Sequence, residues 1–147
     1  MRYDSSVRAI LDTSVLIAAI RSPTGASMAL LDAALKGRIE ILVSVALVLE
    51  YEAVMCRAEH LRVSELSLAE VESLLDSICR IATEVMIQWY WRPQLDDPDD
   101  EMVLEIAING KAEAIVTFNR ADFARAAKRF GLLVLSPREA LERMEIQ

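Results

Sequence analysis

The chain has 147 residues, 54% of them hydrophobic, and a formal net charge of −7 at pH 7. This length and apolar content predict a single globular domain over residues 1–147 and exclude a disordered chain. The acidic balance disfavours nucleic-acid binding through a basic patch, unless bound metal ions supply positive charge. No apolar run approaches the ~20 residues of a membrane-spanning helix, and the N-terminus lacks the apolar segment of a signal peptide. We therefore expect a cytoplasmic protein with no membrane association.

Strand-like and helical segments alternate along the chain. Short apolar runs predict strands at residues 7–11, 39–43, 81–87, 114–117 and 132–135. Apolar residues at helical spacing predict helices at residues 15–20, 26–36, 45–57, 66–79, 98–109, 120–130 and 137–144. The strands are apolar on both faces. Both features indicate an α/β fold in which helices cover the two faces of a mainly parallel sheet of four to five strands.

Single residues carry further structural predictions. Ser44 is expected to cap the N-terminus of the helix that follows it. Gly37 and Gly110 are each expected to end the helix that precedes them. Cys56 and Cys79 lie in helical patterns among apolar residues, which predicts free thiols in the core and a reducing compartment.

Asp12 directly follows the first expected strand, and Thr13 and Ser14 come next. In a parallel α/β sheet, ligands bind in the crevice at the carboxyl ends of the strands. Asp12 is placed where such a site would lie. An aspartate at this position can also cap the helix that follows, so helix capping is the alternative interpretation.

The densest run of acids spans residues 97–101. Most of it has a structural explanation, because Asp97 suits an N-cap and acids stabilise the first turn of a helix. Asp100 differs, because it precedes the apolar Val103 and Leu104 by three and four residues and therefore lies on the face that turns inward. A carboxylate on a buried face needs a partner. Asp100 is thus a candidate site residue, and Asp97, at the mouth of the same helix, is a second.

The helix expected after Ser44 carries two further acids, Glu50 and Glu52. Each of them shares a helix face with apolar residues, so the helical phase does not decide between them. We expect one of the two carboxylates to be buried and the other to be solvated.

The segment after the fourth expected strand repeats the pattern of a strand end followed by a helix start, and it contains Thr117, Asn119 and Asp122. Asn119 and Asp122 can form a capping box, which is the structural interpretation. Thr117 or Asn119 can instead hold a water molecule, a metal ion or a neighbouring carboxylate.

Two features elsewhere receive structural interpretations. His60 stands alone in a polar region and is expected to be solvated. Trp89 and Trp91 are expected to form a packing or interface cluster rather than a base-stacking platform.

Three or four carboxylates that converge on one point cannot all stay ionised without a cation. Their hard oxygen atoms suit Mg²⁺ or Mn²⁺, and no cysteine–histidine spacing indicates zinc. Such ions can activate water and stabilise in-line displacement at phosphorus. Two divalent ions would change the net charge from −7 to −3. A polyanionic substrate could then be drawn in by the metal and by basic residues such as Arg92, Lys111 or Arg120.

These motifs resemble those of the PIN domain family, and the resemblance covers nearly the whole chain. It rests on four segments in the right order and spacing: residues 11–14, Ser44 with Glu50, residues 97–100 with Leu104 and Ala107, and residues 116–119 with Asp122 and Phe123. The chain is most similar to the branch described as toxin components of toxin–antitoxin systems, related to VapC-like toxins.

The resemblance implies a three-layer α/β/α fold and Mg²⁺- or Mn²⁺-dependent ribonuclease activity on single-stranded or structured RNA. It favours Glu50 over Glu52 and implies Asp12, Glu50 and Asp100 as core acids, with Asn119 or Asp122 completing the site. The implied metal ligands are Asp12, Glu50, Asp97, Asp100 and Asn119. Family members commonly form homodimers, and the toxins pair with an antitoxin whose tail blocks the site.

The motifs leave one alternative function open and disfavour two other classes of protein. Many family members have aspartate at the position of Asn119, and an asparagine weakens that ligand. A catalytically weakened PIN-like protein that acts as a binding module therefore stays open as the alternative. A haloacid-dehalogenase-type phosphatase and a phospho-receiver domain are disfavoured, because Ser14 and Ser44 stand where those proteins need aspartates.

Overall fold

The protein is described by a computed structural model that covers residues 7–89 and 94–145. These residues form a five-stranded sheet in the order β3-β2-β1-β4-β5, and every pair of neighbouring strands is parallel. The strands are β1 (Val7–Leu11), β2 (Ile39–Val43), β3 (Thr83–Glu84), β4 (Ala114–Val116) and β5 (Leu133–Leu135). The helices are α1 (Thr13–Arg21), α2 (Ala26–Leu35), α3 (Val45–Met55), α4 (Ala58–Ser64), α5 (Leu68–Ile81), α6 (Pro98–Gly110), α7 (Arg120–Phe130) and α8 (Pro137–Glu145). The predicted α/β fold with a parallel sheet is confirmed.

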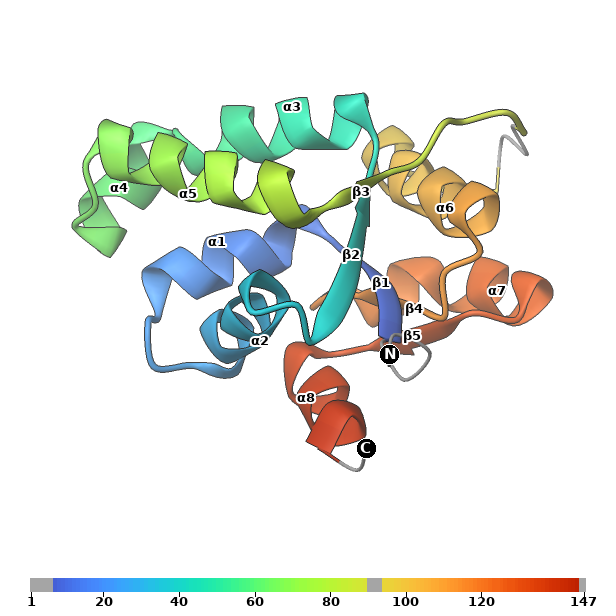
Figure 1. Ribbon diagram of the computed structural model, residues 1–147. Helices are drawn as coiled ribbons and strands as arrows, with labels where there is room; N and C mark the ends of the chain where they lie inside the picture. The colour runs from blue at the N-terminus through green and yellow to red at the C-terminus, as the bar shows by residue number, and fades with distance from the viewer. Residues whose placement is uncertain (1–6, 90–93, 146–147) are drawn as a thin grey trace.

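Helices cover both faces of the sheet. Figure 1 shows α1, α2, α4 and α5 on one side of the strands and α6 and α7 on the other. Helix α8 packs against α2. Helix α3 contacts both α1 and α6 and therefore links the two helical layers beyond the carboxyl end of β2. This placement explains why strands such as β1 and β4 are apolar on both faces: their side chains are buried on each side.

The register of the two central strands fixes where polar residues meet. Leu11 at the end of β1 pairs with Val116 at the end of β4. The backbone N–H of Asp12 then donates to the carbonyl of Val116 at 2.9 Å. Asp12 and Thr117, which are 105 residues apart in sequence, are thereby placed side by side at the carboxyl edge of the sheet.

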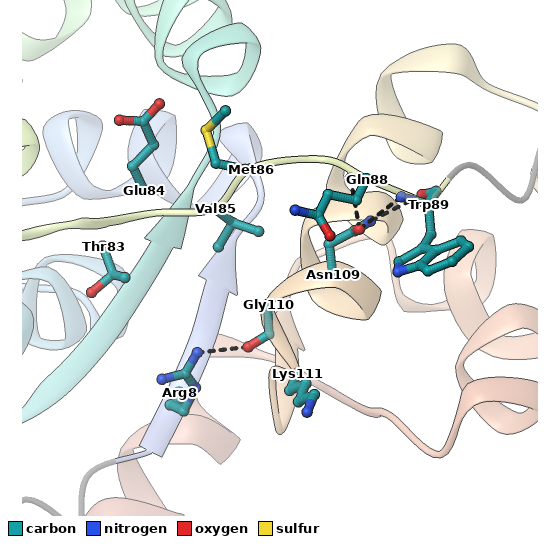
Figure 2. Close-up of a pocket in the computed structure, with 10 residues that line it drawn as sticks. All are labelled: Arg8, Thr83, Glu84, Val85, Met86, Gln88, Trp89, Asn109, Gly110 and Lys111. Atoms are coloured by element: carbon teal, nitrogen blue, oxygen red, sulfur yellow. Dashed lines mark hydrogen bonds between the residues drawn. The ribbon is translucent and has the colours of Figure 1, made fainter.

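The predicted strand at residues 81–87 is largely wrong. Helix α5 continues through Ile81, and β3 contains only Thr83 and Glu84. The chain then leaves β2 and passes over α6, where the side chain of Asn109 accepts hydrogen bonds from the backbone N–H groups of Gln88 and Trp89, both at 2.9 Å. Figure 2 shows these bonds. Asn109 thus satisfies backbone groups that a longer strand would have paired.

The predictions for His60 and Cys79 are wrong. His60 belongs to α4, a helix that the sequence pattern did not reveal, and it is buried because α4 packs against α1. Its Nδ1 atom has no hydrogen-bond partner among the described residues. Both cysteines are free thiols, but Cys56 is only half-buried and Cys79 is exposed.

The helix-end predictions are mostly confirmed. The Ser44 side chain caps α3 by accepting from the N–H of Leu47, and Gly37 follows the end of α2 with a φ of 79°. Gly110 is different, because α6 runs through it. A Cβ at Gly110 would lie 2.8 Å from Val85 Cγ2, so glycine is needed there for close packing and not for ending the helix.

Within the described ranges, no single helix is long and apolar enough to cross a membrane. Helices α1 and α2 meet the length and composition criteria only as a pair, across a bend of 107°.

Candidate functional site

Asp12 occupies the carboxyl end of β1 and is 7% exposed. Its Oδ2 atom accepts hydrogen bonds from Thr117 Oγ1 at 2.7 Å and from Ser14 Oγ at 3.0 Å. Asp12 stands at the N-cap position of α1, but its side chain makes no capping hydrogen bond. The carboxylate is therefore held by two hydroxyls in a fixed orientation. Thr117 was predicted to hold a water molecule, a metal ion or a neighbouring carboxylate, and in the structure it holds the carboxylate of Asp12.

Glu50 projects from α3 toward the same edge. Its Oε2 accepts a hydrogen bond from Thr13 Oγ1 at 2.7 Å, and the residue is half-buried, whereas Glu52 is exposed. Burial raises the pKa of Glu50, and the nearby Asp99 and Asp12 carboxylates raise it further, while the bond from Thr13 opposes them. Glu50 is thus the acid of α3 that joins the cluster.

Asp100 lies in the first turn of α6 and is half-buried. Burial, followed by the charges of Asp97, Asp12, Asp122 and Asp99, raises the pKa of Asp100 to about 6. Three of the candidate motifs therefore act on this one carboxyl group: the end of β1, the start of α6 and the start of α7. Like charges held this closely favour a proton or a cation among them.

Asp97 caps α6 and also belongs to this electrostatic cluster. Its side chain accepts from the backbone N–H of Asp99 at 2.9 Å, as the structural interpretation predicts. Its charge is the second-largest cause of the raised pKa at Asp100, after burial. The two roles are compatible, because a capping carboxylate keeps its negative charge.

Asp99 is a member that sequence reasoning missed. Its carboxyl group hydrogen-bonds to that of Glu50, and its charge acts on both Glu50 and Asp100. The apolar spacing along α6 indicates only the side of the helix that faces the sheet. Asp99 faces α3, and only the packing of α3 against α6 reveals this.

Asn119 and Asp122 lie at the start of α7. Asn119 takes the N-cap position without a side-chain capping bond, and its backbone N–H donates to Thr117 Oγ1 at 2.9 Å. The side chains therefore do not form the capping box. Asp122 is exposed and contributes to the field at Asp100.

The three basic residues predicted to attract a substrate lie at different distances from the acids or outside the described residues. Lys111 is the C-cap of α6, about 20 Å from the acids by the rise of the helix, so it cannot act at this site. It lines a separate pocket of about 710 Å³ together with Arg8 and Trp89, shown in Figure 2. Arg120 lies at the start of α7 and pairs with Glu139 at 2.8 Å. Arg92 lies outside the described residues.

The predicted cluster of Trp89 and Trp91 falls only partly within the described residues. Trp89 is 63% exposed, and Trp91 lies outside the described residues.

The donor set suits a hard divalent cation. Within residues 7–89 and 94–145, no three Asp, Glu, His or Cys side chains are already arranged as metal ligands. Burial, followed by the charges of the neighbouring acids, nevertheless raises the pKa values of Glu50 and Asp100, and the donor atoms of the acids are all oxygen. Mg²⁺ and Mn²⁺ relieve such repulsion and keep several water ligands, so they do not require a complete protein cage.

These features define an α/β protein with a cluster of acids at the carboxyl ends of parallel strands. A family model described as PIN domain matches residues 8–121, and the chain belongs to the PIN domain family, whose members are generally nucleases. A chain in the crystal structure of VapBC2 from Rickettsia felis, bound to a DNA fragment from the promoter, shares this fold. The TM-score is 0.58 at 15% identity, and the match covers 88% of this chain and 98% of that one. No curated protein matches the sequence.

Proposed function

We propose that this protein is a Mg²⁺- or Mn²⁺-dependent endoribonuclease that cleaves single-stranded or structured RNA in the cytoplasm, with one PIN domain spanning residues 1–147. The gathering of carboxylates from three separate segments of the chain around Asp100 carries the proposal. Burial and four of these carboxylates raise the pKa of Asp100 to about 6. Such a concentration of charge destabilises the fold unless it binds a cation. Membership of a family of nucleases supports the same activity.

The proposed metal ligands are Asp12, Glu50, Asp97, Asp100 and Asn119. A divalent ion bound there would supply a Lewis acid for the phosphate and a water molecule of lowered pKa. Thr117 and Ser14 hold the Asp12 carboxylate still, so its oxygen atoms need little reorganisation to bind a cation.

Four acids have proposed catalytic roles. The cation would be bound and oriented by the negatively charged carboxylates of Asp12, Glu50 and Asp100. Asp122 is exposed and its charge acts on Asp100, so we assign it the transfer of a proton from the attacking water or to the leaving oxygen.

We further propose that the protein is the toxin of a toxin–antitoxin pair and forms a homodimer. The VapBC2 structure that shares its fold supports an antitoxin partner. An exposed apolar surface on α3 supports a protein partner, because Val45 is 62% exposed and Leu49 is 59% exposed.

The test is RNA cleavage by the purified protein with Mn²⁺ or EDTA. We expect cleavage only with the metal and its loss in Asp12→Asn, while far-UV circular dichroism stays unchanged. Asp76→Asn, an exposed acid on α5, is the matched control and should cleave like the wild type. Cleavage that persists in Asp12→Asn would contradict the proposal. Intact RNA together with no Asp12-dependent Mn²⁺ binding by calorimetry would favour the weakened binding module, since Asn119 supplies a poorer ligand.

A further inference from the structure

A pocket of about 400 Å³ lies between α1, the start of α2, the start of α8 and Phe118, the residue that follows Thr117. Its lining includes Ala18, Ser22, Ser27, Phe118, Ser136 and Arg138. It combines an aromatic ring, several hydroxyl groups and a cationic side chain, which is a set of groups that suits a nucleotide.

Two residues of the lining, Phe118 and Ala18, connect the pocket to the residues around Asp12. Phe118 lies between Thr117 and Asn119, and its backbone N–H approaches Ser14 Oγ at 3.5 Å. Ser14 in turn donates to Asp12. Ala18 follows Ser14 by one turn of α1 and therefore lies on the same helix face. A ligand whose phosphate contacts the Asp12 cluster would thus place its neighbouring atoms in this pocket.

Phe118 supplies a surface for stacking. The residue is 55% exposed, although it directly follows the fully buried Thr117. An aromatic ring in this position gains little from the core and is available to an unpaired base.

One unneutralised arginine lies at the pocket. Arg138 and Arg120 lie in the first turns of α8 and α7, where the positive end of the helix dipole does not favour cations. Arg120 is neutralised by Glu139, but Arg138 is exposed and pairs with no acid in the described part of the chain. In a protein of charge −7, an unneutralised arginine beside a crevice suits a phosphate group.

We infer that this pocket binds one unpaired nucleotide next to the scissile phosphate, with the base stacked on Phe118 and its phosphate held by Arg138. The inference rests on the proposed function and deepens it, because it requires a single-stranded substrate at this position. Double-stranded RNA could not present a base to the pocket without being unpaired.

The experiment measures binding and cleavage of one fluorescein-labelled single-stranded RNA. Affinity is followed by fluorescence anisotropy with Ca²⁺ in place of Mn²⁺, and KM and kcat are measured with Mn²⁺. We expect Phe118→Ala to weaken binding by about 5- to 150-fold and to raise KM more than it lowers kcat. Phe118→Trp should bind within about threefold of the wild type, because it keeps a stacking surface. Trp89→Ala removes an exposed aromatic ring at the far end of α6 and is the matched control.

Arg138→Gln should weaken binding and reduce the slope of log K against log salt by about 0.7, the value for one lost phosphate contact on a single strand. Arg143→Gln, in the last turn of the same helix, should leave both quantities unchanged. An RNA with one abasic nucleotide beside the cleavage site should bind the wild type as weakly as intact RNA binds Phe118→Ala, and the two losses should not add.

Two results would overturn the inference: Phe118→Ala binding RNA as tightly as the wild type, or Trp89→Ala losing as much affinity. If the wild type still cleaves RNA with Mn²⁺ in either case, the proposed function stands and only the nucleotide pocket fails. If the wild type neither binds nor cleaves RNA, both proposals fail.

Discussion

Replacing Asp100 by asparagine should stabilise the protein without metal and abolish its stabilisation by metal. The pKa of Asp100 rises from 3.8 to about 6 in the folded protein, because of burial and the carboxylates around it. That difference corresponds to about 3 kcal/mol at pH 7.5, and screening of this half-exposed group reduces it to about 1 kcal/mol. In EDTA, Asp100→Asn should therefore unfold roughly 2–4 °C above the wild type.

The pH dependence has a definite sign. Between pH 3.8 and about 6 the folded state binds more protons at Asp100 than the unfolded state does, so this group lowers stability as the pH rises through that window. The difference between Asp100→Asn and the wild type should be near zero below pH 3.8 and complete above pH 6. Thermal unfolding in EDTA at a series of pH values measures it.

Mn²⁺ should reverse the order of the two proteins. A ligand that binds only the folded state at 100 times its Kd stabilises that state by about 2.7 kcal/mol. The wild type should gain this stabilisation, and Asp100→Asn should lose most of it. Asp76→Asn, on an exposed helix face elsewhere, should match the wild type with and without metal. A lower stability of Asp100→Asn than of the wild type in EDTA would contradict this prediction. So would a stabilisation of Asp100→Asn by Mn²⁺ as large as that of the wild type.

Three other substitutions test separate parts of the structure. Thr117→Val removes the hydroxyl that holds Asp12 and should lower Mn²⁺ affinity or RNA cleavage by about 10- to 100-fold, measured by calorimetry and a gel assay, together with a loss of about 1–3 kcal/mol in the free energy of unfolding. Tyr51→Phe removes the buried hydroxyl that donates to the last carbonyl of β1 and should lower the free energy of unfolding by about 1–3 kcal/mol in urea titrations. Gly110→Ala places a methyl group 2.8 Å from Val85 and should cost about 1–3 kcal/mol, with Mn²⁺ affinity unchanged because the site lies at the other end of α6.

The elements that were predictable from the sequence are those whose own residues determine them. Four of the five strands lie within one residue of their predicted bounds, because each is an apolar run flanked by breaking or capping residues. Ser44 caps α3 through a local hydrogen bond. Helical phase alone predicted that Asp100 lies on the inward side of α6, and the residue is half-buried because α6 packs against the sheet.

The missed features depend on contacts between distant segments. Helix α4 has seven residues, too few for a clear apolar stripe, and its packing against α1 buries His60. The segment that follows the predicted third strand, Gln88 and Trp89, binds Asn109 of α6, which draws the chain away from β2. The phase of α3 could not separate Glu50 from Glu52, because the choice depends on a hydroxyl group 37 residues earlier, that of Thr13. None of these three contacts leaves a signal in the local sequence pattern.

The bond between Thr117 and Asp12 has a consequence for the timing of synthesis. Its two ends are 105 residues apart, and β4 must pair with β1 before they meet. A ribosome that has made only the first two-thirds of the chain has produced Asp12 and Glu50 without Asp100, Thr117 or Asp122. The growing chain therefore cannot assemble the acid cluster until translation is nearly finished, and fragments released early lack it altogether.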